Sequence, residues 1–254
     1  MENLLTYSIL IATIFISGSA IFLFKTENPR VLKLILAFSG AFLLSISFLN
    51  LLPEVFNGSV EKSGLYILIG FILQLVLELL TKGIEHGHGH AHECCENHDH
   101  SEHLPKIAPL GLMIGICMHS FLEGMPLIHC AGDHDHDHVQ HSLTMGIIIH
   151  NIPISFVLMS IFIQSGMSKI KSFILLGIFA IMTPAGSLLS SLINNEYIHD
   201  FESYFSIIMG LVVGIFLHVS TSILFETSED HQYNIKKFIT VLLGIAVALL
   251  IPMH

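Results

Sequence analysis

Charged side chains are scarce in this sequence: only 12% of its 254 residues are Asp, Glu, Lys or Arg, while 52% are hydrophobic. The mean hydropathy of +0.74 is too high for a soluble domain of this length. Basic residues are especially few, and no cluster of Lys and Arg indicates a nucleic-acid partner. The shortage of charge therefore excludes an ordinary soluble domain and predicts an all-α membrane protein.

Cysteine is also scarce, and its four positions do not form a disulfide framework. Cys94 and Cys95 are adjacent in a segment that we expect to face the cytoplasm, where thiols stay reduced. Cys117 and Cys130 lie within and just beyond an apolar segment, where a free thiol usually packs as a small hydrophobic side chain. Only the adjacent pair is therefore a candidate for metal chemistry.

Long apolar segments recur along the whole chain. Each has roughly 17–25 mostly apolar residues, the length that an α-helix needs to cross about 30 Å of hydrocarbon. The first segment follows Met-Glu-Asn, which lacks the positive residues of a cleavable signal peptide, so we expect it to be retained. We predict a single membrane domain over residues 1–254 with eight transmembrane helices. Their ranges are 4–24, 31–53, 64–84, 107–128, 141–165, 172–193, 203–225 and 237–252.

The basic residues indicate the orientation of these helices. Nine of the ten lie in or beside alternate loops, and the opposite loops hold only Lys62. The nine are Lys25, Arg30, Lys33, Lys82, Lys106, Lys169, Lys171, Lys236 and Lys237. Because positive residues are retained on the cytoplasmic side, these loops should be cytoplasmic and both termini should lie outside. We expect a multi-pass protein of a cell membrane, of the bacterial inner-membrane type.

Two of the predicted loops are rich in histidine. The cytoplasmic loop, residues 85–106, begins EHGHGHAHECCENHDHSEH, and the outer loop, residues 129–141, ends in DHDHDHVQH. Neither has the fixed spacing of a zinc finger, so several ligand sets could hold an ion without a rigid site. A solvated spacer is the simpler alternative for each loop. The candidate ligands are His86, His88, His90, His92, Cys94, Cys95, His98 and His100 in the first loop, and His134, His136 and His138 in the second.

Ionisable residues also interrupt two of the apolar segments. His119 and Glu123 are four residues apart, so they share one face of the predicted helix 107–128. A carboxylate at this depth costs at least about 3 kcal/mol unless it is paired, protonated or in contact with water. A lone histidine here would more often be a packing residue, but the pair indicates an intramembrane function.

A second polar group lies at a comparable depth in the predicted helix 141–165. His150 and Asn151 are followed by Pro153, which frees the carbonyl oxygen of Ile149 from the helical hydrogen-bond pattern. Freed carbonyls are tolerated at membrane depth where protein or a wet path covers them. Imidazole, carboxylate and amide groups together favour a divalent ion, zinc above all.

Four other polar residues give weaker signals. His218 and Asn50 could support the metal ligands or form packing hydrogen bonds. Gln74 and Glu78 are four residues apart, but Glu78 lies close to the predicted inner interface, where solvation explains it.

The motifs HSFLEG and HNIPIS resemble the metal-binding motifs of the fourth and fifth helices of the ZIP (ZRT/IRT-like) family of divalent-metal transporters. The resemblance extends to NLLPE, TPAG and the histidine-rich loop, and so covers nearly the whole chain. It implies a 3+2+3 arrangement of eight helices with inverted repeats, transport toward the cytosol and a homodimer. Residues 40–54 and 210–226 agree with such repeats, because both apolar runs end in Glu and cross in opposite senses.

The resemblance also assigns a transport path residue by residue. At position 154, where the family has a glutamate, this chain has Ile154, so a two-metal site would lack one carboxylate. The assigned ligands are His119, Glu123 and His150 for the first ion, with Ser120 and Asn151 placed for a second.

The predicted function is therefore transport of divalent ions, most of all zinc, into the cytosol, and not enzymatic catalysis. Iron, manganese, nickel, cobalt and cadmium are further candidate ions. One alternative is a membrane sensor or receptor that binds metal without transport. The other is an intramembrane metallohydrolase in which Glu123 activates a zinc-bound water, although the sequence has no HExxH motif. The expected partners are divalent ions, the lipid bilayer and a second copy of the chain, with no nucleic acid.

Overall fold

The computed structural model describes residues 2–23, 29–57, 61–80, 108–127, 137–197, 201–226 and 235–251. All regular secondary structure in these residues is helical, as the composition predicts. Each predicted apolar segment contains a helix. The helices are α1 (Glu2–Ser19) with a 3-10 turn (Ala20–Phe22), α2 (Pro29–Ile46), a π-helical turn (Ser47–Leu51), α3 (Leu52–Asn57), α4 (Ser63–Leu80), α5 (Ala108–Gly124), α6 (Asp137–Gln164), α7 (Lys169–Tyr197), α8 (Phe201–Glu226) and α9 (Ile235–Leu249).

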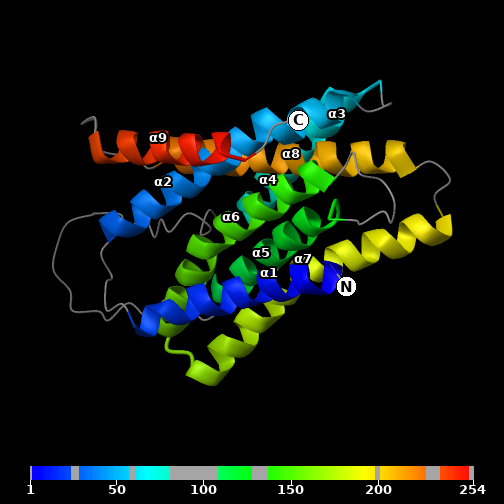
Figure 1. The fold of residues 1–254 in the computed structure, drawn as a ribbon. Helices are drawn as coiled ribbons and strands as arrows, with labels where there is room; N and C mark the ends of the chain where they lie inside the picture. The colour runs from blue at the N-terminus through cyan, green and yellow to red at the C-terminus, as the bar shows by residue number, and fades with distance from the viewer. Residues whose placement is uncertain are drawn as a thin grey trace.

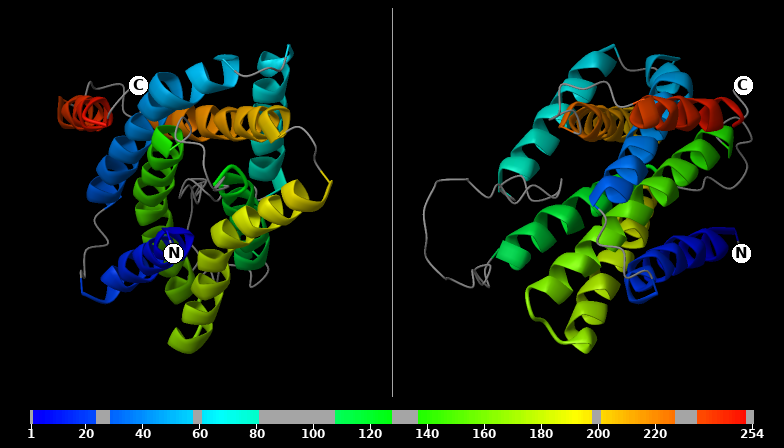
Figure 2. Two further views of the ribbon diagram at one scale, coloured as in Figure 1. Left: turned by 45° about the vertical axis from the view of Figure 1, so that its right-hand side comes forward. Right: turned by 90° about the vertical axis from the view of Figure 1, so that its left-hand side faces the viewer.

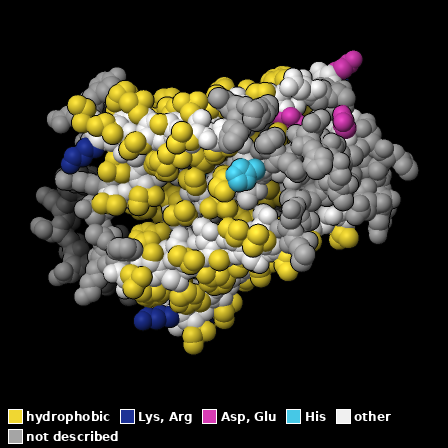
Figure 3. Space-filling model, viewed as in Figure 1, with side chains coloured by type: hydrophobic (Ala, Val, Ile, Leu, Met, Phe, Trp, Pro, Cys, Tyr) yellow, Lys and Arg dark blue, Asp and Glu magenta, His cyan; other side chains and the backbone are white. Residues whose placement is uncertain are grey.

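Five helical stretches in the described residues are long and apolar enough to span a membrane. They are Leu4–Phe22, Val31–Asn57, Val139–Gln164, Lys169–Ile193 and Glu202–Phe225. Shorter apolar helices cover Ser63–Leu79 and Gly111–Gly124. On the face seen in Figure 3, hydrophobic side chains fill the middle, Lys and Arg lie at one end and Asp and Glu at the other. These features identify a multi-pass membrane protein.

The helices form two groups (Figure 1). In the first, α4 packs mainly on α8, and α2 packs on α9 and α8. In the second, α5 packs mainly on α7, and α1 packs on α6 and α7. Figure 2 shows the same two groups from other directions. The larger buried cluster lies mostly among α2, α6 and α8, and the smaller one among α5, α6 and α7.

Helix α6 contributes to both hydrophobic clusters. Leu143 and Ile147, in its first half, belong to the larger cluster. Leu158 and Phe162, in its second half, belong to the smaller one. The segment 150–153, with its two polar residues and its proline, lies between these two sets. The polar residues therefore lie where α6 passes from one group of helices to the other.

Glycines allow two helix pairs to approach with their backbones in contact. An added Cβ at Gly70 of α4 or Gly214 of α8 would collide with a backbone carbonyl of the other helix. The same holds for Gly124 of α5 and Gly186 of α7. Small residues allow such contacts in membranes, where helix packing takes the place of the hydrophobic effect. These contacts hold α4 and α5, which both contribute to the site below, against their neighbours.

Helix ends differ from the sequence prediction. Helix α6 begins at Asp137, so residues 137–141 of the predicted outer loop are helical. Helix α7 covers Lys169–Tyr197 and is longer than the predicted 172–193. Hydropathy locates only the apolar part of a helix, whereas polar residues can extend it beyond the hydrocarbon.

Candidate metal centre

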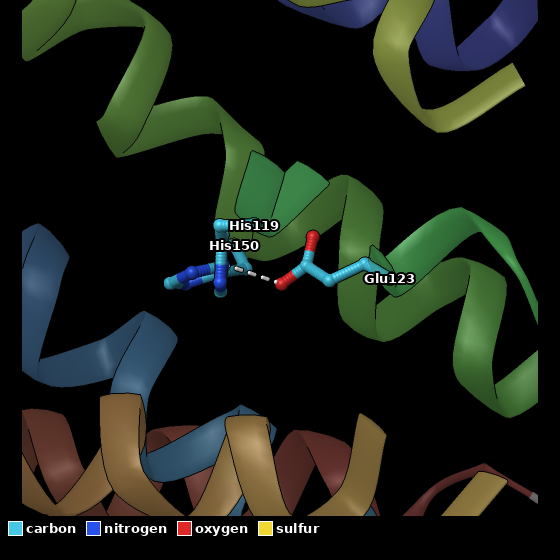
Figure 4. Close-up of side chains that lie close together, drawn as sticks. All are labelled: His119, Glu123 and His150. Carbon is cyan, nitrogen blue, oxygen red and sulfur yellow. Dashed lines mark ion pairs between the residues drawn. The ribbon is translucent and has the colours of Figure 1, made fainter. Parts of the chain in front are cut away.

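Three side chains predicted as ligands come together between α5 and α6. His119 and Glu123 project from α5 and His150 from α6, and Figure 4 shows them turned toward one another. One potential ligand atom from each lies within 4.8 Å of the others. The exposed fractions are 3% for His119, 0% for Glu123 and 1% for His150. The arrangement places two imidazoles and one carboxylate around a buried point.

The two ligands on α5 are already in contact. The Nε2 atom of His119 lies 2.7 Å from Oε1 of Glu123, across one helical turn. Neither carboxylate oxygen of Glu123 has a hydrogen-bond partner among the described residues, which leaves both oxygens available to an ion. An ion bound by both atoms would need Nε2 of His119 in its unprotonated form, as is usual when histidine becomes a metal ligand.

Gln74 of α4 orients His119 from the other side. Its Oε1 lies 3.0 Å from Nδ1 of His119, and Gln74 is completely buried. With the amide oxygen accepting from Nδ1–H, the Nε2 atom is directed toward Glu123. This contact was not predicted from the sequence, where Gln74 stood out only as a neighbour of Glu78. Its one sequence signal was a polar side chain in a mostly apolar helix.

Ser39 of α2 contacts the second imidazole. Its Oγ lies 3.4 Å from Nδ1 of His150, and Ser39 is 1% exposed. The rings of His150 and His119 meet edge to face, with centroids 5.8 Å apart. Ser39 was not predicted from the sequence, because serine is common within membrane helices. Each histidine of the centre is thus oriented by a neutral residue from the first group of helices.

The two residues predicted for a second ion lie in different surroundings. Asn151 is 1% exposed, and neither its amide nitrogen nor its oxygen has a hydrogen-bond partner in the part of the chain that the structure describes. Such a group is costly in an apolar medium, which favours a ligand or water beside it. Ser120 is turned to α7, where its hydroxyl lies 2.9 Å from that of Thr183.

Ile154 occupies a packing position. It is partly buried and contacts the hydrophobic cluster of α5, α6 and α7. No carboxylate therefore stands at this position, and Glu123 is the one carboxylate in the group of three ligands. An ion held there would be balanced by a single negative charge.

The weaker polar candidates form contacts between helices. Nδ2 of Asn50 donates to Oγ of Ser142 at 3.1 Å. Nδ1 of His218 lies 3.5 Å from Oε2 of Glu78. Solvation at the predicted inner interface therefore explains the position of Glu78 only in part, because Glu78 also contacts a histidine of α8.

Most candidate ligands of the histidine-rich loops lie outside the residues that the structure describes. The cytoplasmic loop 85–106 lies outside the described residues, as do His134 and His136 of the outer loop. His138 falls in the first turn of α6.

Comparisons with known proteins identify the family of the chain. The family model described as ZIP Zinc transporter matches residues 85–252, which include both motif-bearing helices, α5 and α6. Zinc transporter SLC39A7 of Rattus norvegicus is 28% identical over 108 residues, an alignment that covers 32% of this chain and 23% of the rat protein. The chain thus matches less than a quarter of that relative's length. Because the family match covers more than half of the sequence, the chain belongs to the ZIP family of zinc transporters.

Proposed function

We propose that this protein carries divalent metal ions, most of all zinc, across a cell membrane into the cytosol. The observation that carries the proposal is the convergence of His119, Glu123 and His150 within 4.8 Å inside the helix bundle. Such groups are expensive to bury without a purpose, and an ion that stops on them supplies one. The family supports the same function.

The ligand set favours zinc. Two imidazoles and one carboxylate suit a borderline ion, and a fourth position remains for water or for Asn151. Iron, manganese, nickel, cobalt and cadmium could use the same ligands with different affinity. With Ile154 in place of a carboxylate, we infer that one ion rather than two occupies the centre at a time. The lower charge should weaken binding and speed release.

We further infer the family arrangement of eight transmembrane helices as 3+2+3, with both termini outside. In Figure 1, α1 begins and α9 ends at the same end of the bundle. In the same view, the basic side chains of Figure 3 lie at the opposite end, where the positive-inside rule places the cytoplasm. A bacterial-type inner membrane and a homodimer complete this proposal.

The histidine-rich loops fit a supporting role on either side of the path. The outer segment 129–141 would raise the local ion concentration, and the cytoplasmic segment 85–106 would receive ions that leave the centre. Both have the His-rich composition of metal-binding tracts without fixed ligand spacing.

Uptake of radiolabelled zinc into proteoliposomes tests the function against its rivals. The wild-type protein should show saturable zinc uptake. Metal binding without uptake of zinc, iron, manganese, nickel or cobalt would favour a sensor. Such a protein would have lost transport when Ile154 took the place of the family's glutamate on α6. Hydrolysis of a peptide or lipid that depends on Glu123, without ion flux, would instead favour a metallohydrolase.

A further inference from the structure

The end of α5 that carries Glu123 is packed closely against α7. An added Cβ at Gly124 would collide with the carbonyl oxygen of Thr183 in α7. One at Gly186 of α7 would collide with the carbonyl oxygen of Phe121 in α5. The two backbones are therefore in contact just before and just after Glu123, and the position of this residue depends on how α5 lies against α7.

Two hydroxyl groups hold the chain where it leaves α5. Ser187 of α7 donates its hydroxyl hydrogen to the carbonyl oxygen of Leu127, beyond the end of α5. The same Oγ lies 2.8 Å from the hydroxyl oxygen of Tyr7 in α1. Because a serine hydroxyl has a single hydrogen, Tyr7 must be the donor in this second bond. The two bonds therefore run in one direction, from Tyr7 through Ser187 to the backbone beyond α5.

The backbone carries this attachment back to Glu123. The N–H of Leu127 donates to the carbonyl oxygen of Gly124 at 3.1 Å, and Gly124 directly follows Glu123. Leu127 is 4% exposed and Ser187 is 1% exposed, so the bond between them is shielded from water. A shift of Leu127 away from α7 would therefore move the last turn of α5, which has few other hydrogen bonds to restrain it.

Glu123 depends on its backbone more than the two histidines of the centre do. Gln74 orients His119, and Ser39 contacts His150. In the part of the chain that the structure describes, the carboxylate of Glu123 has its ion-pair contact with His119 but accepts no hydrogen bond. Its place in the centre is thus set mainly by the backbone from which it projects.

We propose that Ser187 and Tyr7 are positioning residues of the metal centre, which act on Glu123 through the backbone of residues 124–127. The inference rests on the proposed transport function, in which Glu123 is an ion ligand. Without the bond from Ser187, the last turn of α5 can move relative to α7, and the carboxylate meets the ion in a less favourable position. The ion then binds more weakly at the centre.

Zinc binding and zinc uptake by the full-length protein test this proposal. The variants are Ser187→Ala, Tyr7→Phe and the double variant. Ser190→Ala is the matched control, because Ser190 is a buried serine of the same helix whose hydroxyl lies 2.7 Å from that of Tyr204 in α8. Equilibrium dialysis of the detergent-solubilised protein, with the zinc bound by Glu123→Ala subtracted, measures binding at the centre alone.

The net contribution of one hydrogen bond corresponds to about a fivefold change in affinity, so Ser187→Ala should bind zinc about fivefold more weakly and raise the KM of uptake by a similar factor. Its kcat should not fall, because weaker binding eases release, whereas a simple loss of folded protein would lower kcat. Tyr7→Phe should raise KM less. The double variant should match Ser187→Ala, because Tyr7 acts only through Ser187.

The control should keep wild-type zinc affinity even if its unfolding midpoint falls as far as that of Ser187→Ala. Wild-type affinity in Ser187→Ala would overturn the proposal. An equal loss of affinity in Ser190→Ala would also overturn it, because any buried hydroxyl of α7 would then have the same effect. Tyr7→Phe, which removes one oxygen atom, keeps the test available if Ser187→Ala does not fold, and wild-type affinity there would remove Tyr7 from the proposal.

Failure of the proposed function has a different signature. If the wild-type protein binds zinc at the centre but shows no uptake, the transport function is wrong. The binding affinities of the Ser187, Ser190 and Tyr7 variants still decide whether the two hydroxyl groups position Glu123.

Discussion

Gln74→Leu removes the acceptor that α4 presents to Nδ1 of His119. The bond measures 3.0 Å and both residues are buried, so bulk water does not replace the lost partner. Loss of a residue that orients a histidine ligand typically lowers metal affinity or activity about 10–100-fold. That range corresponds to about 1.4–2.7 kcal/mol. Leucine has a similar volume, so the expected defect comes from the orientation of His119 and not from a cavity.

Initial rates of zinc uptake over a range of zinc concentrations measure this effect. We expect kcat/KM to fall by the stated factor in Gln74→Leu, because the imidazole no longer directs Nε2 toward Glu123. Gln164→Leu is the matched control, since Gln164 is exposed near the end of α6 and bonds only locally to Ser160. Equal kcat/KM for Gln74→Leu and Gln164→Leu would refute the orienting role of Gln74.

Three further predictions concern other parts of the structure. Ile154→Glu places the carboxylate of the family motif near His150, so zinc should bind more tightly and leave more slowly. Zinc uptake should then show a lower KM and a lower kcat, and an unchanged KM would contradict this prediction. Gly214→Leu forces apart the backbones of α4 and α8 and should lower the thermal unfolding midpoint, whereas Gly64→Ala, with open space around it, should not. Deletion of residues 85–103 should lower the number of zinc ions bound per chain by equilibrium dialysis but preserve uptake; loss of uptake would place that loop in the path itself.

The sequence predicted the helices well because the bilayer constrains them strongly. Backbone groups in hydrocarbon must bond within their own helix, so long apolar segments have few alternative structures. The ends of helices are less constrained, which is why α6 extends to Asp137 through polar residues. The π-helical turn Ser47–Leu51 was not anticipated; it precedes Pro53, which has no N–H to donate to the preceding turn.

The candidate metal centre was predictable where charge or motif marked a residue. His119, Glu123 and His150 stood out because ionisable groups are rare in apolar helices. Gln74 and Ser39 could not be assigned in the same way, since neutral side chains cost less to bury and their contacts depend on how α4 and α2 pack against the other group. The pairing of Glu78 with His218 likewise joins helices that are far apart in the sequence.

The most direct test of the transport path is zinc uptake by Glu123→Ala beside Glu202→Ala, which removes an exposed carboxylate of α8. Glu123 supplies the single carboxylate of the centre, so its loss leaves a divalent ion without a counter-charge at that point. We expect saturable uptake in the wild type and in Glu202→Ala, and none above protein-free liposomes in Glu123→Ala. Normal uptake by Glu123→Ala would show that ions cross this protein by another route.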